Sequence, residues 1–172
     1  MVDDGRAAEG PRPSRPRFPA GYGVPQTEEG LLPWTWARTQ LQQAITYWLV
    51  TTSPDGRPHT IPTWGAWVDD HFYCEGSPKT RYARNIARDP RVLVHLGSGD
   101  EVVIVEGVAT LLETIDEDLS RRVAGGYGKY RSAKDYEVDS SLWPGGLWVV
   151  KPLTARGWIR LDQATRWTFE PR

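Results

Sequence analysis

The sequence holds little that would fix a metal ion or a covalent cross-link. Cys74 is the only cysteine among 172 residues, so the chain can form neither an internal disulfide nor a cysteine cluster for zinc. The three histidines, His59, His71 and His95, match no closed zinc site together with Cys74. We therefore expect no bound metal, and a reducing compartment such as the cytoplasm is compatible with this composition.

Long apolar runs and an excess of one charge are also lacking. Runs such as Leu147–Val150 are far shorter than the ~20 residues that a membrane span needs, and the N-terminus has no apolar signal core. The 21 basic and 22 acidic residues give a formal net charge of -1, so no global field attracts nucleic acid or an anionic membrane. These absences predict a cytoplasmic protein that acts on small molecules, with neither nucleic acid nor a membrane as its partner.

Two common catalytic motifs are missing as well. No Gly-x-Ser-x-Gly elbow occurs, which argues against the usual serine hydrolase. The segment Gly125–Lys129 resembles a phosphate-binding loop only loosely, because Val123 replaces the first glycine and Tyr130 replaces the Ser or Thr. Nucleotide hydrolysis is therefore not predicted.

What the chain does contain divides into a tail and one domain. Residues 1–25 are rich in Gly, Pro and Arg without a periodic apolar face, which predicts a flexible tail. Residues 26–172 fit a single domain of ordinary size. Nine tryptophans indicate that aromatic surface contributes to the core, to an interface or to a pocket for a planar ligand.

Helical patterns occur at three places. Apolar residues recur at three- and four-residue steps from Pro33 to Trp48. A third helix is expected from Asp116 to about Tyr127, and the residues from there to Gly146 are predicted to be an ordered loop. The second helix, which begins after Gly76, carries the functional prediction described below.

Strand patterns fill most of the remainder. Tyr47–Thr52 is rich in aromatic and β-branched residues, and the turn Ser53–Gly56 makes it the first half of a hairpin. The returning segment, Arg57–Val68, contains Pro58 and Pro62, which predicts an edge or bulged strand beside a ligand because proline cannot donate to a ladder. Further strands are expected at His71–Glu75, Arg91–Leu96, Val102–Leu112, Leu147–Lys151, Ala155–Arg160 and Ala164–Phe169. About eight strands joined mostly by turns, with about three helices, predict a mainly β, α+β antiparallel barrel.

The second helix offers an anion site at its start. We expect Ser77 as the N-cap, Pro78 in the first helical position and Asp89-Pro90 as the stop. Backbone N–H groups, hydroxyls and two cations would converge there, from the residues Ser77, Lys79, Thr80 and Arg81. An ordinary capped helix with solvated basic side chains is the alternative interpretation of this segment alone.

The order of these pieces resembles the pyridoxamine-phosphate-oxidase-like, flavin-binding split-barrel family. The resemblance runs from about Leu32 through Gly107, and it includes the Pro54–His59 turn, the strand with Pro62 and Trp64, and the Ser77–Asn85 helix. The closing Ala164–Phe169 is similar to the end of bacterial members. The resemblance implies an FMN-binding split barrel that works as a homodimer with flavin at the interface.

The same resemblance implies the cofactor-binding residues. Lys79, Thr80 and Arg81, next to Ser77, would hold the flavin phosphate. The strand residues along the ribityl chain and the ring would be His59, Thr60, Ile61, Pro62, Thr63 and Trp64. Leu32–Ala37 is similar to the branch with deazaflavin-dependent reductases, so the cofactor is FMN or a deazaflavin coenzyme of the F420 type. Arg81, Arg84 and Arg88 are candidates for the acidic tail of a deazaflavin.

The function predicted from these residues is a flavin-dependent oxidoreductase that transfers a hydride between the flavin and a small organic or planar substrate. Candidates for proton donors or substrate contacts are His59, Tyr127 and Tyr130. A non-catalytic module that binds flavin or haem is the alternative. True pyridoxamine 5'-phosphate oxidation is disfavoured, because Arg160-Leu161-Asp162 lacks the histidine of that signature.

Overall fold

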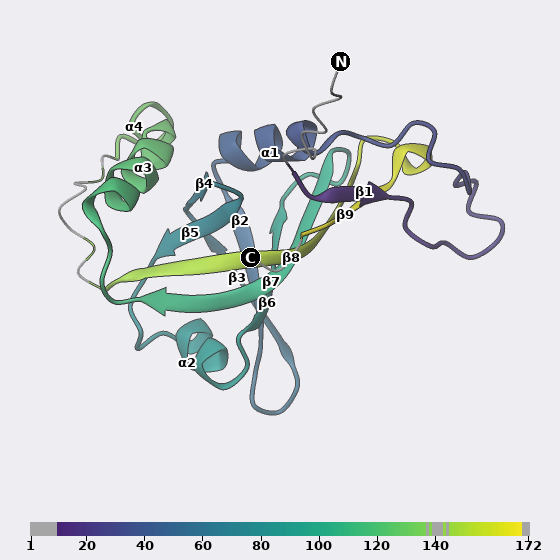
Figure 1. Cartoon of the computed structure of the whole chain (residues 1–172). Helices are drawn as coiled ribbons and strands as arrows, with labels where there is room; N and C mark the ends of the chain where they lie inside the picture. Colours follow the sequence, from purple (N-terminus) through teal and green to yellow (C-terminus); the bar gives the residue numbers. More distant parts are fainter. Residues whose placement is uncertain (1–9, 137, 139–142, 144, 170–172) are drawn as a thin grey trace, which may run out of the picture.

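The computed structural model describes residues 10–136, 138, 143 and 145–169, in which nine strands form one antiparallel sheet (Figure 1). The strands are β1 (Arg12–Ser14), β2 (Tyr47–Thr52), β3 (Pro58–Thr63), β4 (Ala66–Val68), β5 (His71–Glu75), β6 (Arg91–Leu96), β7 (Val102–Leu112), β8 (Leu147–Trp158) and β9 (Thr165–Thr168). The helices are α1 (Trp34–Gln43), α2 (Arg81–Arg88), α3 (Glu117–Tyr127) and α4 (Lys129–Lys134), with a 3-10 turn at Leu161–Gln163. This architecture confirms the predicted α+β fold.

The sheet is split rather than closed. Its strands follow the order β1-β9-β8-β7-β6-β2-β3, and β5 pairs both with β4 and with β8. β8 therefore serves both branches: its first residues pair with β5 and its last with β9, while β7 runs along its full length. Although β3 and β4 follow one another in the chain, each has another partner, so the sheet stays open between them. The opening lies at Trp64 and Gly65.

Alternating side chains create the core. In β7, Val103, Val105 and Ala109 face inward and are buried, as expected for a strand that is solvated on one face. The apolar stripe of α1 rests on this core through Trp34, whose ring meets Trp167 edge to face at 5.4 Å. Figure 1 shows α1 and α2 on opposite sides of the strands.

The predicted hairpin and its edge strand are confirmed, but the prediction of one continuous returning strand over Arg57–Val68 was wrong. The segment is interrupted at Trp64 and Gly65, because β3 pairs with β2 whereas β4 pairs with β5. β2 pairs with β3 from Tyr47 opposite Thr63 to Thr52 opposite Pro58, and β3 is the last strand of its branch. Pro58 and Pro62 lie on the exposed face of β3. A proline is tolerated there because an edge strand forms only one ladder.

Two helix boundaries differ from the prediction. The first helix ends at Gln43, because β2 takes over at Tyr47 and the chain must extend before it. The second begins at Arg81 with Thr80 as its N-cap, so the prediction of Ser77 as N-cap and Pro78 as first helical residue was wrong. The Thr80 hydroxyl accepts a hydrogen bond from the Ala83 N–H, and a turn closed by Thr80 N–H to Ser77 O at 3.1 Å precedes it.

Three further differences involve the strands and the loop. Arg12–Ser14, inside the predicted tail, forms β1 and pairs with β9. Leu147–Lys151 and Ala155–Arg160 are not separate strands: β8 runs on through a bulge, where Gly107 pairs with Pro152 and Glu106 with Thr154. The predicted loop before Gly146 begins with α4, and part of it, residues 137, 139–142 and 144, lies outside the described residues.

Candidate functional site

The edge strand β3 presents its backbone beside the opening of the sheet. His59, Ile61 and Thr63 are half-buried, whereas Thr60 and the two prolines are exposed. In an antiparallel ladder, alternate residues direct their N–H and C=O groups away from the partner strand. An edge strand therefore offers free backbone acceptors and, except at proline, donors that a ligand can use.

The start of α2 presents cationic groups. Lys79 and Arg81 are both exposed, and the Ser77 hydroxyl beside them accepts a hydrogen bond from the Lys79 N–H at 3.2 Å. The first N–H groups of a helix have no partner within the helix and carry the positive end of its dipole. The Thr80 hydroxyl is engaged on both sides, since it also donates to Ser77 O at 2.9 Å. Its side chain therefore shapes the turn.

Hydrogen bonds attach α2 to the β2–β3 hairpin. Arg81 Nη2 donates to the buried Ser53 Oγ at 3.0 Å. The buried Asn85 donates to Thr51 Oγ1 at 3.0 Å, and Thr51 Oγ1 lies 3.4 Å from His59 Nδ1. These contacts bring Arg81 and His59 to the same end of β3, as the sequence predicts for a shared site.

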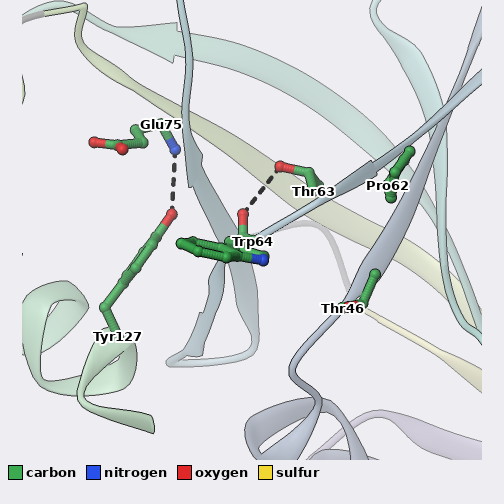
Figure 2. Close-up of a pocket in the computed structure, with 6 residues that line it drawn as sticks. All are labelled: Thr46, Pro62, Thr63, Trp64, Glu75 and Tyr127. Carbon is green, nitrogen blue, oxygen red and sulfur yellow. Dashed lines mark hydrogen bonds between the residues drawn. The ribbon is translucent and has the colours of Figure 1, made fainter. Parts of the chain in front are cut away.

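The other end of β3 borders a cavity of about 410 Å³. Figure 2 shows Trp64 at its centre, between Glu75 and Tyr127 on one side and Pro62 and Thr63 on the other. Thr46 completes the lining. The Trp64 side chain is 37% exposed and stacks on Tyr130, with ring centroids 5.0 Å apart and planes inclined by 19°. Tyr136 also meets the Trp64 ring edge to face at 5.2 Å. The part of the Trp64 ring that stays exposed gives the cavity an aromatic surface beside the edge strand.

The tyrosines of α3 and α4 hold the chain that crosses the opening. The Tyr130 hydroxyl accepts from the Gly65 N–H at 2.9 Å and donates to Gly65 O at 3.1 Å. The Tyr127 hydroxyl accepts from the Glu75 N–H at 3.3 Å (Figure 2). Burial raises the pKa of Tyr130 to about 12 and raises the pKa of Tyr127 as well. Both hydroxyls thus stay protonated and serve the backbone.

Lys129 connects α4 to β2 next to Tyr130. Its Nζ donates to Tyr47 Oη at 2.7 Å and lies 4.8 Å and 5.3 Å from the ring centroids of Tyr47 and Tyr130. Burial lowers the pKa of Lys129 to about 8. The hydrogen bond to Tyr47 holds the Lys129 side chain between α4 and β2.

Three residues of the site were not predicted from the sequence. Thr46 and Glu75 line the cavity, and Tyr136 donates a hydrogen bond to Glu75 Oε1 at 3.0 Å. Glu75 lies two residues before Ser77 in the sequence, and this closeness to the predicted anion site could have marked it as a candidate. Tyr136 falls in the segment that the sequence predicts as a loop, where no periodicity points to it.

The donor set fits a flavin phosphate at one end of β3 and a flavin ring at the other. Lys79 Nζ, the Arg81 guanidinium and the Ser77 hydroxyl are groups that bind phosphate oxygens. Trp64 and Pro62 supply a flat apolar surface, and the free edge of β3 supplies backbone groups for a ring edge. Among residues 10–136, 138, 143 and 145–169, no group of three or more His, Cys, Asp or Glu side chains could hold a metal ion.

The sequence matches one known family over most of its length. Residues 36–158 match the family described as pyridoxamine 5'-phosphate oxidase. No curated protein matches the chain. Within the described part of the chain, no helix is long and apolar enough to cross a membrane.

Solved structures with the same fold bind different cofactors. A haem-binding protein from Mycobacterium smegmatis is 20% identical with a TM-score of 0.60, over 77% of this chain and 56% of that one. An F420 reductase is 22% identical with a TM-score of 0.50, over 70% and 92% of the two chains. An FAD-binding protein from Mesorhizobium loti is 20% identical with a TM-score of 0.52, over 76% and 92%. The fold is therefore shared, and because the family match covers more than half of the sequence, this chain belongs to the pyridoxamine 5'-phosphate oxidase family.

Proposed function

We propose that the protein is a flavin-dependent oxidoreductase that transfers a hydride between a bound FMN or deazaflavin and a small organic or planar substrate. One arrangement carries the proposal: the unpaired edge of β3 joins the cationic start of α2 to the aromatic surface of Trp64. Membership of the family and the FAD-binding and F420-reducing neighbours support a flavin-type cofactor.

Phosphate binding is assigned to the turn before α2. Lys79 and Arg81 neutralise the ester, Ser77 donates a hydroxyl, and Thr80 contributes through the backbone because its hydroxyl caps the helix. The Arg81–Ser53 hydrogen bond orients the guanidinium before a ligand arrives. For a deazaflavin, Arg84 and Arg88 on the exposed side of α2 would meet the acidic tail.

The ring would lie along β3. Thr60 and Ile61 follow the ribityl chain, Pro62 and Thr63 border the ring, and Trp64 packs on it. When bound, the flavin supplies the hydride chemistry, so the protein must orient the substrate and exclude water from the ring. The tight hydrogen bonds of Tyr130 to Gly65 keep Trp64 in place for this task.

Of the proton-donor candidates, Tyr127 and Tyr130 have their hydroxyls committed to backbone groups. The His59 ring is half-buried with Nδ1 near Thr51 Oγ1, at the phosphate end of β3. This position, away from Trp64, favours a contact of His59 with the cofactor over proton donation beside the ring. We expect His59→Ala to weaken cofactor binding while the bound complex still turns over.

A homodimer with flavin at the interface belongs to the same proposal. A largely apolar groove, about 310 Å³, runs over β2, β6, β7 and β8, and its lining includes Val50, Leu93 and Leu153. Leu153 is 49% exposed although it sits in a strand. Exposed apolar surface of this kind is typical of an interface, and sedimentation of the purified protein would measure the association.

The experiment is a titration of the purified protein with FMN, with FAD and with an F420-type deazaflavin. We expect at least one cofactor to change its visible spectrum and to raise the melting temperature, and the reduced complex to be oxidised by an organic acceptor. Mass spectrometry of the small molecule that co-purifies identifies the natural cofactor. If neither spectrum nor melting temperature changes with any of the three, the proposal fails.

A second candidate is a module that binds flavin or haem without turnover. It is favoured by the engagement of both tyrosine hydroxyls at the cavity and by the fold shared with a haem-binding protein. Binding without oxidation of the reduced cofactor by any acceptor would support it. True pyridoxamine 5'-phosphate oxidation finds no support at Arg160, which pairs with Asp162 in the position of the expected signature.

A further inference from the structure

Four arginines surround a second cavity at the other side of the fold. The cavity measures about 420 Å³ and is lined by Arg15, Pro16, Arg17, Arg156 and Arg166. We call it the arginine pocket. Its residues come from the segment after β1, from the C-terminal end of β8 and from β9; β1 and β9 lie in Figure 1 at the end of the molecule away from α3 and α4.

Two of the arginines face each other across neighbouring strands. Arg156 in β8 is directly opposite Arg166 in β9, and both side chains lie on the outer face of the sheet. Like charges directly opposite each other destabilise an antiparallel pair. The chain keeps this pair although a polar uncharged residue would fit either exposed position.

The positive charge of the pocket is only partly compensated. Arg156 pairs with Glu106 at 2.5 Å, the one ion pair between a carboxylate and any of the four arginines among the described residues. Burial acts to raise the pKa of Glu106, but hydrogen bonds from Arg156 and Thr154 and the charges of Arg156 and Arg166 together lower it. Asp162 is a second carboxylate near the pocket, since the charge of Arg15 helps to lower its pKa, so two carboxylates face four guanidinium groups.

Arg15 is fixed as a rigid wall of the pocket. Its guanidinium donates to four main-chain oxygens, those of Thr27, Glu29, Asp162 and Ala164, at 2.5 to 3.0 Å. Carbonyl groups orient the guanidinium without cancelling its charge. Arg17 and Arg166 are exposed at the mouth, where their donors can turn toward a ligand.

We propose that the arginine pocket binds the diphosphate group of a small molecule, separately from the cofactor phosphate at α2. Guanidinium groups bind phosphate oxygens in a bidentate manner. The exposed guanidinium groups of Arg17 and Arg166, next to the charges of Arg15 and Arg156, match a group with two or more negative charges. The cavity volume suits a small ligand. An exposed single phosphate would engage fewer of the arginines than a diphosphate, so the longer anion is preferred.

The test is isothermal titration calorimetry with inorganic pyrophosphate, in the full chain and in its Lys79→Ala variant, which removes the main cation at α2. We expect one site per chain in the variant background, at least tenfold tighter than for inorganic phosphate. Adding Arg166→Gln or Arg17→Gln should each weaken this site at least tenfold. Arg12→Gln, on the same face but outside the pocket lining, is the matched control and should change the affinity less than threefold.

Thermal melting separates binding from a structural role. Arg166→Gln should raise the melting temperature of the ligand-free protein, because it removes repulsion with Arg156, and should remove the rise that pyrophosphate causes. The proposal is overturned if pyrophosphate binding is absent, if it is lost with Lys79→Ala but kept with Arg166→Gln, or if Arg12→Gln weakens it equally. Tighter binding of a single-stranded oligonucleotide than of pyrophosphate would also overturn it.

Discussion

Near Trp64, polar groups at the opening of the sheet have protein partners. The Tyr130 hydroxyl forms hydrogen bonds with both the N–H and the C=O of Gly65, and the Tyr127 hydroxyl accepts a hydrogen bond from the Glu75 N–H. At the start of α2, by contrast, Lys79 and Arg81 are exposed, and no carboxylate among the described residues pairs with either, although Arg81 donates one hydrogen bond to Ser53. The first region is completed by the chain itself and acts as a scaffold. The second has the features of a surface that is completed by an anion.

The largest effect should follow from opening the scaffold. Tyr130→Phe leaves the buried Gly65 N–H and C=O without their partner, and an unsatisfied buried group costs about 1–3 kcal/mol. We expect the free energy of unfolding to fall by about 2–4 kcal/mol in urea titrations. Tyr22→Phe, at an exposed tyrosine, is the control. A loss no larger than that of the control would mean that the hydroxyl is dispensable.

The next effect concerns the cationic surface formed by Lys79 and Arg81, and it should not alter the hydrogen bonds around Gly65. Lys79→Ala should weaken flavin binding by about 1–3 kcal/mol, the scale of a lost charge-assisted hydrogen bond. The free energy of unfolding should hardly change, since Lys79 is exposed. Lys134→Ala, at the exposed end of α4, is the matched control in the same fluorescence titration. Equal affinities for both variants would move the phosphate site elsewhere.

Trp64→Ala should produce a somewhat smaller loss, because the ring contributes stacking rather than charge. An aromatic pair contributes about 0.5–1.5 kcal/mol beyond its buried area, so flavin affinity should fall by about 1 kcal/mol. Trp64→Phe should recover most of it. The change in the flavin spectrum on binding reports directly on the ring. An unaltered spectrum with Trp64→Ala would place the ring away from this cavity.

The smallest effect is a change in pH dependence. Burial lowers the pKa of Lys129 to about 8 from 10.5, so between these values the unfolded chain binds more protons and stability rises with pH. Above about pH 10 the raised pKa values of Tyr47 and Tyr130 act in the opposite direction. Denaturant titrations from pH 7.5 to 9.5 should show that the free energy of unfolding of the unsubstituted protein rises with pH. The Lys129→Met variant should lack this rise. The same slope in both proteins would refute the assignment.

Much of the fold could be predicted from local chemistry. The aromatic and β-branched run at Tyr47 predicts β2, the turn Ser53–Gly56 predicts the hairpin, and Pro58 and Pro62 predict an edge strand, all of which the structure confirms. The end of α2 at Asp89 is also confirmed. These features depend on residues that are close in sequence.

What could not be predicted depends on distant contacts. Ser77 and Thr80 have equal chemistry for capping, and only the turn closed by the Thr80 N–H decides between them. β8 continues past Pro152 because β7 accommodates a bulge opposite Gly107. The hydroxyl of Tyr130 reaches Gly65 across 65 residues, which no pattern of the sequence reveals.

The candidate site shows the same division. Hydrogen bonds connect the predicted phosphate residues at α2 to the hairpin that contains β3. The family resemblance made it possible to predict that these two segments share a site, whereas local chemistry alone does not link them. Glu75 and Tyr136 were missed, since their hydrogen bond joins β5 to a segment beyond α4. The roles of the predicted residues stay predictions until a cofactor is bound.

A crystal structure of the protein with FMN tests the central claim most directly. We predict phosphate oxygens within hydrogen-bond distance of Lys79 Nζ and the Arg81 guanidinium, with the isoalloxazine ring against Trp64. An FMN whose own phosphate lies in the arginine pocket, or whose ring does not touch β3, would contradict this account.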